Sequence, residues 1–196
     1  MTKRSTSFDP VKHEYRIGGR VVPSVTQVLR DLIPGWSASE WYLNRGTAVH
    51  ACAAMIADGV VFENDPQIDG QVAACRKWFA DVKPEVVAVE RQVYSDAYQY
   101  AGTLDLQANI GGMDVLIDWK GSLTPATKHQ LAAYSMCIHD EQVKKGMGVE
   151  LRDDGTYKCS ELYDLTKAGR EWLALLSAYR IRRACGVKET EEEAGE

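Results

Sequence analysis

The sequence lacks long apolar runs, and no stretch of its 196 residues approaches the length of a membrane-spanning helix. Its first residues, MTKRSTSFDP, lack the apolar core of a secretory signal peptide. It also lacks internal repeats and low-complexity linkers. These absences predict a cytoplasmic protein with one domain over residues 1–188, followed by an acidic, disordered tail over residues 189–196.

Cysteine is scarce and scattered, with five residues and neither a CxxC motif nor a cluster of Cys and His. A zinc site or a disulfide framework is therefore not supported. Positive charge is also scarce, since the chain has 23 Lys and Arg but 28 Asp and Glu, which gives a net charge of −5. This balance argues against a protein held to nucleic acid by bulk electrostatics. A local basic stretch, Tyr179–Lys188, leaves the docking of DNA open.

Turn and capping signals divide the chain into elements. Gly-Gly pairs at 18–19 and 111–112 and an Asp-Gly pair at 154–155 predict three hairpins. A further strand is expected over 86–94, and helices over 25–32, 40–59, 66–83, 126–139 and 166–183. The predicted helix starts are Ser24 with Gln27, Ser37 with Glu40, Asp65 with Pro66, and Thr124 with Pro125. This order predicts an α+β fold with a central mixed sheet flanked by helices.

The stretch GTLDLQANIGGMDVLIDWKG, residues 102–121, places two aspartates and a lysine within runs that otherwise resemble buried strands. If Gly111 and Gly112 form a two-residue loop, the register is fixed by the pair Ile110 and Met113. Alternate residues from Leu104 to Ala108 and from Val115 to Trp119 then form one apolar face.

On the opposite face of this hairpin, the register places Asp105 across from Asp118 and Thr103 across from Lys120. Directly opposed residues have Cβ atoms roughly 4.5–5.5 Å apart, and like charges there are destabilising. Two opposed carboxylates need a cation or a shifted pKa, and Lys120 or a divalent metal can supply the charge. The alternative is an ordinary solvated face of a hairpin.

Other polar residues fall on elements that would surround this face. Glu90 interrupts the strand VVAVERQV, His50 lies within a helix of small residues, and Gln130 and Tyr134 share a helix face. Each also has a structural interpretation. A lone helical histidine is more often a packing residue, a Gln/Tyr pair is usually helix surface, and Glu90 can pair with Lys120.

Together these motifs resemble the PD-(D/E)XK phosphodiesterase superfamily, in particular RecB-type and phage-lambda-exonuclease-like nucleases, over roughly residues 12–165. The matching motifs are RGTAVH with Gly46 and His50, VERQV with Glu90, AGTLDL with Gly102 and Asp105, IDWKG with Asp118 and Lys120, and HQLAAY with Gln130 and Tyr134. The resemblance implies an α/β/α sandwich-like fold with a restriction-endonuclease-like αβββαβ core. No proline precedes Asp105, and the cysteine quartet of the iron–sulfur relatives is absent, so no iron–sulfur cluster is expected.

The resemblance also implies a cofactor, one or two ions of Mg²⁺ or Mn²⁺, and roles for individual residues. Asp105, Asp118, Lys120 and Glu90 would be catalytic. The metal ligands would be Asp105, Asp118, the Trp119 carbonyl, His50 and Glu90. The residues expected to contact the substrate are Gln130, Tyr134, Arg45 and Lys128.

The implied activity is a metal-dependent deoxyribonuclease, most simply a phage or prophage type of exonuclease in recombination, repair or replication. Its implied partners are DNA and a single-strand annealing protein, in the cytoplasm of a bacterial host. Two alternatives remain open: an endonuclease on the same core, or a catalytically silent DNA-binding adaptor subunit. Cleavage polarity, strand preference and oligomeric state are not encoded in these motifs.

Overall fold

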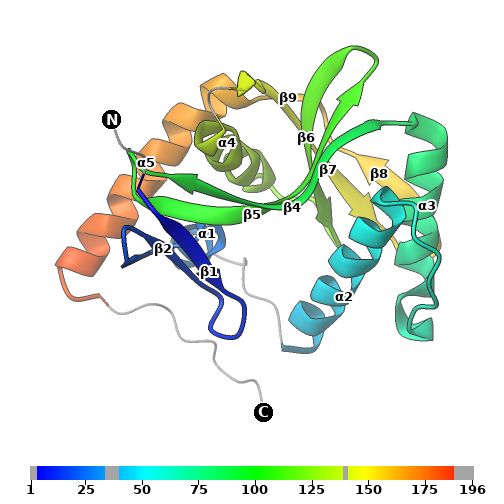
Figure 1. Cartoon of the computed structure of the whole chain (residues 1–196), viewed down its shortest axis with the longest axis horizontal. Coiled ribbons are helices and arrows are strands. Elements are labelled where there is room, and N and C mark those ends of the chain that lie inside the picture. Colours follow the sequence, from blue (N-terminus) through cyan, green and yellow to red (C-terminus); the bar gives the residue numbers. More distant parts are fainter. Residues whose placement is uncertain (1–3, 34–39, 139–140, 188–196) are drawn as a thin grey trace.

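The structure is a computed structural model that describes the chain over residues 4–33, 40–138 and 141–187. A six-stranded mixed sheet forms its centre (Figure 1). Its strands are β4 (Glu85–Ser95), β5 (Tyr100–Ile110), β6 (Met113–Lys120), β7 (Lys145–Leu151), β8 (Tyr157–Cys159) and β9 (Tyr163–Asp164). β6 and β7 run parallel, whereas the other neighbouring strands are antiparallel. The predicted α+β class with a mixed sheet is confirmed.

Helices cover both faces of this sheet (Figure 1). One face packs against α1 (Val25–Leu32), α4 (Thr127–Cys137) and α5 (Leu165–Ala184). The other packs against α2 (Glu40–Ala57) and α3 (Asp69–Val82), which follows a short 3₁₀ turn, η1 (Pro66–Ile68). A separate three-stranded sheet comprises β1 (Thr6–Asp9), β2 (Glu14–Ile17) and β3 (Arg20–Val22).

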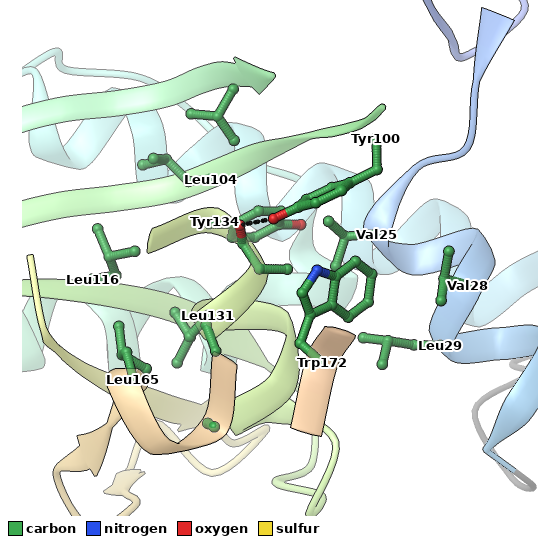
Figure 2. Packing of buried hydrophobic residues seen from close by; sticks show 14 of the residues in the cluster. Val25, Val28, Leu29, Tyr100, Leu104, Leu116, Leu131, Tyr134, Leu165 and Trp172 are labelled. Atoms are coloured by element: carbon green, nitrogen blue, oxygen red, sulfur yellow. Dashed lines mark hydrogen bonds between the residues drawn. The ribbon is translucent and has the colours of Figure 1, made fainter. Parts of the chain in front are cut away.

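The first core cluster lies between the sheet and helices α1, α4 and α5. Trp172 of α5 is fully buried against Tyr100 of β5, with ring centroids 5.1 Å apart. The Tyr100 hydroxyl donates to the Ala133 carbonyl of α4 at 2.8 Å. Figure 2 shows these rings surrounded by aliphatic side chains such as Leu131 and Leu29. Burial of these large apolar side chains holds α4, and the polar residues on it, against the sheet.

Local sequence signals placed most boundaries correctly. Ser24 and Gln27 form the predicted capping box of α1. Asp65 and Pro66 begin the 3₁₀ turn rather than α3 itself, which starts three residues later. The cap predicted at Ser37 lies outside the described residues, as does the acidic tail over residues 189–196.

The predicted cap at Thr124 and Pro125 is wrong. Helix α4 begins at Thr127, and its N-cap residue, Ala126, makes no side-chain hydrogen bond. The Thr124 hydroxyl is buried without a hydrogen-bond partner among the described residues. Strands β1 and β9 were not predicted, because they are only four and two residues long, too short to show an alternating pattern.

The arginines of the basic stretch at the end of α5 contact α1 and the β4–β5 turn. Arg182 and Arg183 both pair with Asp31 of α1, whose side chain is 2% exposed. Arg180 donates to the carbonyl of Tyr98 in the β4–β5 turn. These contacts use much of the charge that the sequence offered for DNA docking.

We expect Asp31→Asn to lower the free energy of unfolding by about 1.5–3 kcal/mol at pH 7, the range for hydrogen bonds to a charged group. Burial opposes ionisation of Asp31, but its bonds to Arg183 and Arg182 hold its pKa below the usual value. Its stabilisation is therefore present above pH about 4 and lost as the pH falls through the lowered pKa. Urea unfolding at several pH values measures this, and the difference between the two proteins should shrink on acidification.

The exposed pair Arg4 and Asp96 supplies the control, with a separation of 3.4 Å and side chains 58% and 46% exposed. Asp96→Asn should change the free energy of unfolding by less than about 0.5 kcal/mol. An equal effect of both substitutions would contradict a special role for Asp31.

Candidate active site

The β5–β6 hairpin has the predicted register near its turn and departs from it near the aspartates. Gly111 and Gly112 take φ values of 59° and 85°, and pairing runs from Ile110 with Met113 to Leu106 with Ile117. The ladder ends there, one residue before the predicted pair of Asp105 and Asp118. Asp105 Oδ2 instead accepts a hydrogen bond from the Trp119 backbone N–H at 2.8 Å.

The predicted single apolar face is correct for Leu106 and Ala108 of β5 and for their partners on β6, but it is wrong at Leu104. Leu104 packs in the cluster beneath α4 and α5, whereas Leu106 packs in the cluster beneath α2 and α3. Residues two apart on a regular strand share a face. The faces therefore exchange at Asp105, and β4 changes in step, because Val93 packs with the first cluster and Val89 with the second.

Glu90 lies at this exchange on β4, with a φ of 44° that is uncommon for a residue with a side chain. The register passes from Val89 with Leu106 to Arg91 with Leu104, which leaves Glu90 across from Asp105. The left-handed conformation costs roughly 1–2 kcal/mol and directs the Glu90 carboxylate toward Asp105.

Three possible metal ligands from three elements converge here. One ligand atom each from His50 of α2, Glu90 of β4 and Asp105 of β5 lies within 4.8 Å of the other two. Asp105 is buried, His50 is partly buried and Glu90 is exposed. The site is therefore open to solvent on the Glu90 side and closed beneath Asp105.

His50 links the two sides of the cluster. Its Nδ1 lies 3.3 Å from Asp105 Oδ1, and its Nε2 lies 3.1 Å from the Trp119 carbonyl oxygen. Burial alone would lower the pKa of His50, but the Asp105 carboxylate raises it to about 9. The same contact lowers the pKa of Asp105 although burial opposes its ionisation. Although Glu90 as a whole is exposed, partial burial of its carboxyl group, together with the charge of Asp105, raises the pKa of Glu90 to about 7.

Asp118 and Lys120 form the second part of the site. Lys120 Nζ lies 2.8 Å from Asp118 Oδ2, and the Asp118 side chain is only 1% exposed. Apart from this contact with Lys120, no hydrogen bond from a described residue reaches either Asp118 oxygen. Burial raises the pKa of Asp118 to about 6, although Lys120 opposes the shift. Asp118 is thus a buried carboxylate that Lys120 neutralises in part, and its other oxygen remains a possible ligand for a cation.

The backbone carbonyl of Trp119, between Asp118 and Lys120 in the chain, is held in place by an aromatic cluster. Trp119 is 2% exposed and packs edge-on against Trp78 of α3, with ring centroids 5.1 Å apart. Trp119 therefore fixes the end of β6, and with it the backbone that carries Asp118 and Lys120. The family resemblance named the Trp119 carbonyl as a metal ligand, but nothing in the sequence predicted the packing of the Trp119 ring.

Gln130 and Tyr134 lie on the buried face of α4, not on its surface. Gln130 Nε2 donates to the Tyr134 hydroxyl at 3.1 Å, and Gln130 Oε1 has no hydrogen-bond partner among the described residues. Burial raises the pKa of Tyr134, and the charges of Asp118 and Asp105 raise it further. The pair therefore borders the two carboxylates, and its contact with the substrate stays a prediction.

Gly102 explains how Tyr134 comes so close to β5. A Cβ at position 102 would lie 2.6 Å from Tyr134 Cε1, below any normal contact. We expect Gly102→Ala to lower the free energy of unfolding by about 1–3 kcal/mol, the usual cost of overpacking. Chemical denaturation measures the loss. In the double variant Gly102→Ala/Tyr134→Leu the two losses should be less than additive, whereas additive losses would contradict the contact.

The two predicted phosphate contacts are both engaged with acids. Arg45 of α2 forms an ion pair with Asp153 of the β7–β8 turn. Lys128 Nζ lies 2.7 Å from Glu171 Oε2, and the same oxygen lies 2.7 Å from His129 Nε2. Each would have to exchange its carboxylate for a phosphate in order to bind DNA.

One residue near the site had no sequence signal. The Tyr15 hydroxyl of β2 hydrogen bonds with the Thr103 hydroxyl at 2.8 Å, two residues before Asp105. Tyr15 is 2% exposed and stacks on Phe8 with ring centroids 4.5 Å apart. The small sheet thus supports β5 beside the candidate site, a contact between residues 88 positions apart.

No family model and no curated protein matches the chain. Two solved structures of the alkaline exonuclease LHK-Exo from Laribacter hongkongensis are similar to it, each with 14% identity and a TM-score of 0.40. The structure in complex with dAMP matches over 85% of this chain and 95% of that chain, and the other over 84% and 94%. Among the described residues, none of the helices combines the length and apolar character needed to span a membrane. Similarity at this level does not assign an activity.

Proposed function

We propose that the chain is a metal-dependent deoxyribonuclease that hydrolyses phosphodiester bonds, most simply as an exonuclease. One observation carries the proposal: His50, Glu90 and Asp105 converge from three elements within 4.8 Å. They converge beside a buried Asp118 that is paired with Lys120. Each of these five residues belongs to one of the motifs that resemble the PD-(D/E)XK nucleases, and the motifs occur in the same order along the chain.

The donor set suits a small divalent cation. Mg²⁺ binds oxygen ligands at about 2.1 Å, so ligand atoms up to about 4.2 Å apart can share one ion. The three ligand atoms lie within 4.8 Å of one another, close to this limit. The buried Asp118 carboxylate, which Lys120 contacts at one oxygen, is a further acceptor for positive charge. The imidazole of His50 favours Mn²⁺ over Mg²⁺, because nitrogen is a softer donor than carboxylate oxygen.

The chain's own residues account for the remaining chemistry. A bound divalent ion would polarise the scissile phosphate and lower the pKa of an attacking water. Lys120 lies against Asp118 and would stabilise the negative charge that develops on the phosphoryl oxygens. Because this lysine is paired with a carboxylate, the electrostatic role suits it better than that of a free base. Gln130 and Tyr134 border the same carboxylates and would orient the substrate or Lys120.

The alternatives differ in what they require of this site. A silent DNA-binding adaptor has no need of Glu90 in a costly left-handed conformation that faces Asp105. An endonuclease would use the same residues, so the site does not separate it from an exonuclease. We retain the exonuclease of phage or prophage type, acting in recombination, repair or replication with a single-strand annealing protein, because the motif set resembles such enzymes.

Digestion of labelled DNA tests the activity. The purified protein should degrade end-labelled linear DNA with Mn²⁺ or Mg²⁺ and be inactive with EDTA. A closed circular DNA of the same sequence should survive, since an exonuclease needs an end. Cleavage of the circle would make the protein an endonuclease. Absence of hydrolysis with both metals on single- and double-stranded DNA, with and without a 5′ phosphate, would refute the proposal.

A further inference from the structure

Twelve of the glycines that the structure describes have an evident structural reason. Seven take a positive φ, in turns and helix ends. Five more lie where a Cβ would come within 3.3 Å of a neighbouring atom: Gly70, Gly102, Gly146, Gly148 and Gly169. Gly46 and Gly121 have neither reason. No φ in the left-handed region occurs at either one, and no described atom lies within 4 Å of where a Cβ would be.

Gly46 is the more telling of the two. It lies within helix α2, where glycine is less favourable than alanine because it leaves the unfolded backbone more freedom. The space beside it would accept a methyl group without displacing a described atom. A residue that breaks a local rule without a packing reason is expected at a functional site.

Both glycines border the candidate active site. Gly46 and His50 are four apart on α2, so they share a helix face about 6 Å apart along the axis. Nε2 of His50 lies 3.1 Å from the Trp119 carbonyl, two residues before Gly121. Gly121 directly follows Lys120 at the end of β6. The two open positions therefore adjoin the same junction of α2 and β6.

We infer that Gly46 and Gly121 leave open the space through which the sugar–phosphate backbone of DNA passes the candidate metal site. The inference rests on the proposed function and adds to it the path of the substrate. Glycine permits the closest approach of a ligand to the protein backbone. A phosphodiester must come into direct contact with the residues at Asp105 and Lys120 to be hydrolysed, and a side chain at either glycine would project into the space beside them.

The test separates DNA binding from folding and from metal binding. Affinity is measured by fluorescence anisotropy with fluorescein-labelled single- and double-stranded oligonucleotides under Ca²⁺, and stability by thermal unfolding with and without Mn²⁺. Gly46→Ala should raise the melting temperature by about 2 °C. Gly46→Leu should weaken DNA binding at least about tenfold, and Gly121→Val should weaken it in the same direction. The rise in melting temperature caused by Mn²⁺ should be unchanged in all three.

Ala48→Leu is the matched control, because Ala48 is exposed and lies about 200° around α2 from Gly46. It adds the same bulk to the opposite side of the helix and should leave DNA affinity unchanged. Unchanged affinity in both Gly46→Leu and Gly121→Val would overturn the inference. So would a lower melting temperature of Gly46→Ala, or loss of the Mn²⁺ response, since either gives the glycine a structural role. If the wild-type protein neither binds nor cleaves DNA, the proposed function itself fails together with this inference.

Discussion

Asp118→Asn is expected to reduce DNA cleavage by at least about 10³-fold while the protein remains folded. The loss is of the size found when a group that stabilises transition-state charge is removed. The fold should survive because asparagine has nearly the same shape as aspartate and the negative charge of Asp105, which disfavours an ionised Asp118, lies nearby. Initial rates on end-labelled DNA, with thermal unfolding of the same preparations, measure both effects.

Lys120→Met should lower the cleavage rate by about 10²–10³-fold at saturating DNA, because it keeps the length of the side chain and removes its charge. Lys77→Met supplies a control of the same chemistry. Lys77 lies on the outer side of α3, where it pairs with Asp81 at 2.9 Å and is 56% exposed. Cleavage that persists in Asp118→Asn or Lys120→Met, or that falls equally in Lys77→Met, would refute the assignment of the site.

The second large effect concerns the core behind the site. We expect Trp172→Ala to lower the free energy of unfolding by about 3–5 kcal/mol, the range for truncating a buried aromatic ring. Trp172 is 0% exposed and packs on Tyr100, whose hydroxyl binds the α4 backbone at Ala133 (Figure 2). The cavity would loosen both α5 and α4. Urea denaturation followed by circular dichroism measures the change.

Trp172→Phe is the graded control, since it retains a ring and should lose clearly less stability than Trp172→Ala. Because α4 carries Gln130 and Tyr134, the Ala variant should also lose activity at temperatures below its own unfolding transition. A loss under about 1 kcal/mol in Trp172→Ala would show that this cluster is not the main support of α4.

The resemblance to nucleases came from short motifs, and the structure shows how several of their residues depend on one another. Gly102 is required by the Tyr134 ring, three residues before Asp105. Tyr134 in turn holds Gln130 beside the carboxylates. His50 is spaced to reach both Asp105 and the Trp119 carbonyl from one helix. The motifs therefore describe one interlocked site and not five separate features.

Sequence reasoning was most accurate where the determining interactions are local. The capping box at Ser24 and the glycine turn at Gly111–Gly112 depend on residues within four positions of each other, and both were placed correctly. Strand alternation also predicted the register up to Leu106 and Ile117. The same reasoning failed for the cap at Thr124, where packing of the loop around Ala126, which is 1% exposed, overrides the local preference.

The sequence by itself determined the α+β order of elements, the hairpins and the candidate acids, because turns, caps and alternation are encoded by neighbouring residues. Only the tertiary structure decided how those acids meet. The exchange of faces at Glu90 and Asp105 turns Asp105 toward His50 and ends the ladder before Asp118. The alternation of apolar residues does not predict that exchange, because β4 and β5 pack against α4 and α5 on one face and against α2 and α3 on the other. The physical reason is that a strand's faces are assigned by what covers them, and the covering helices are distant in sequence.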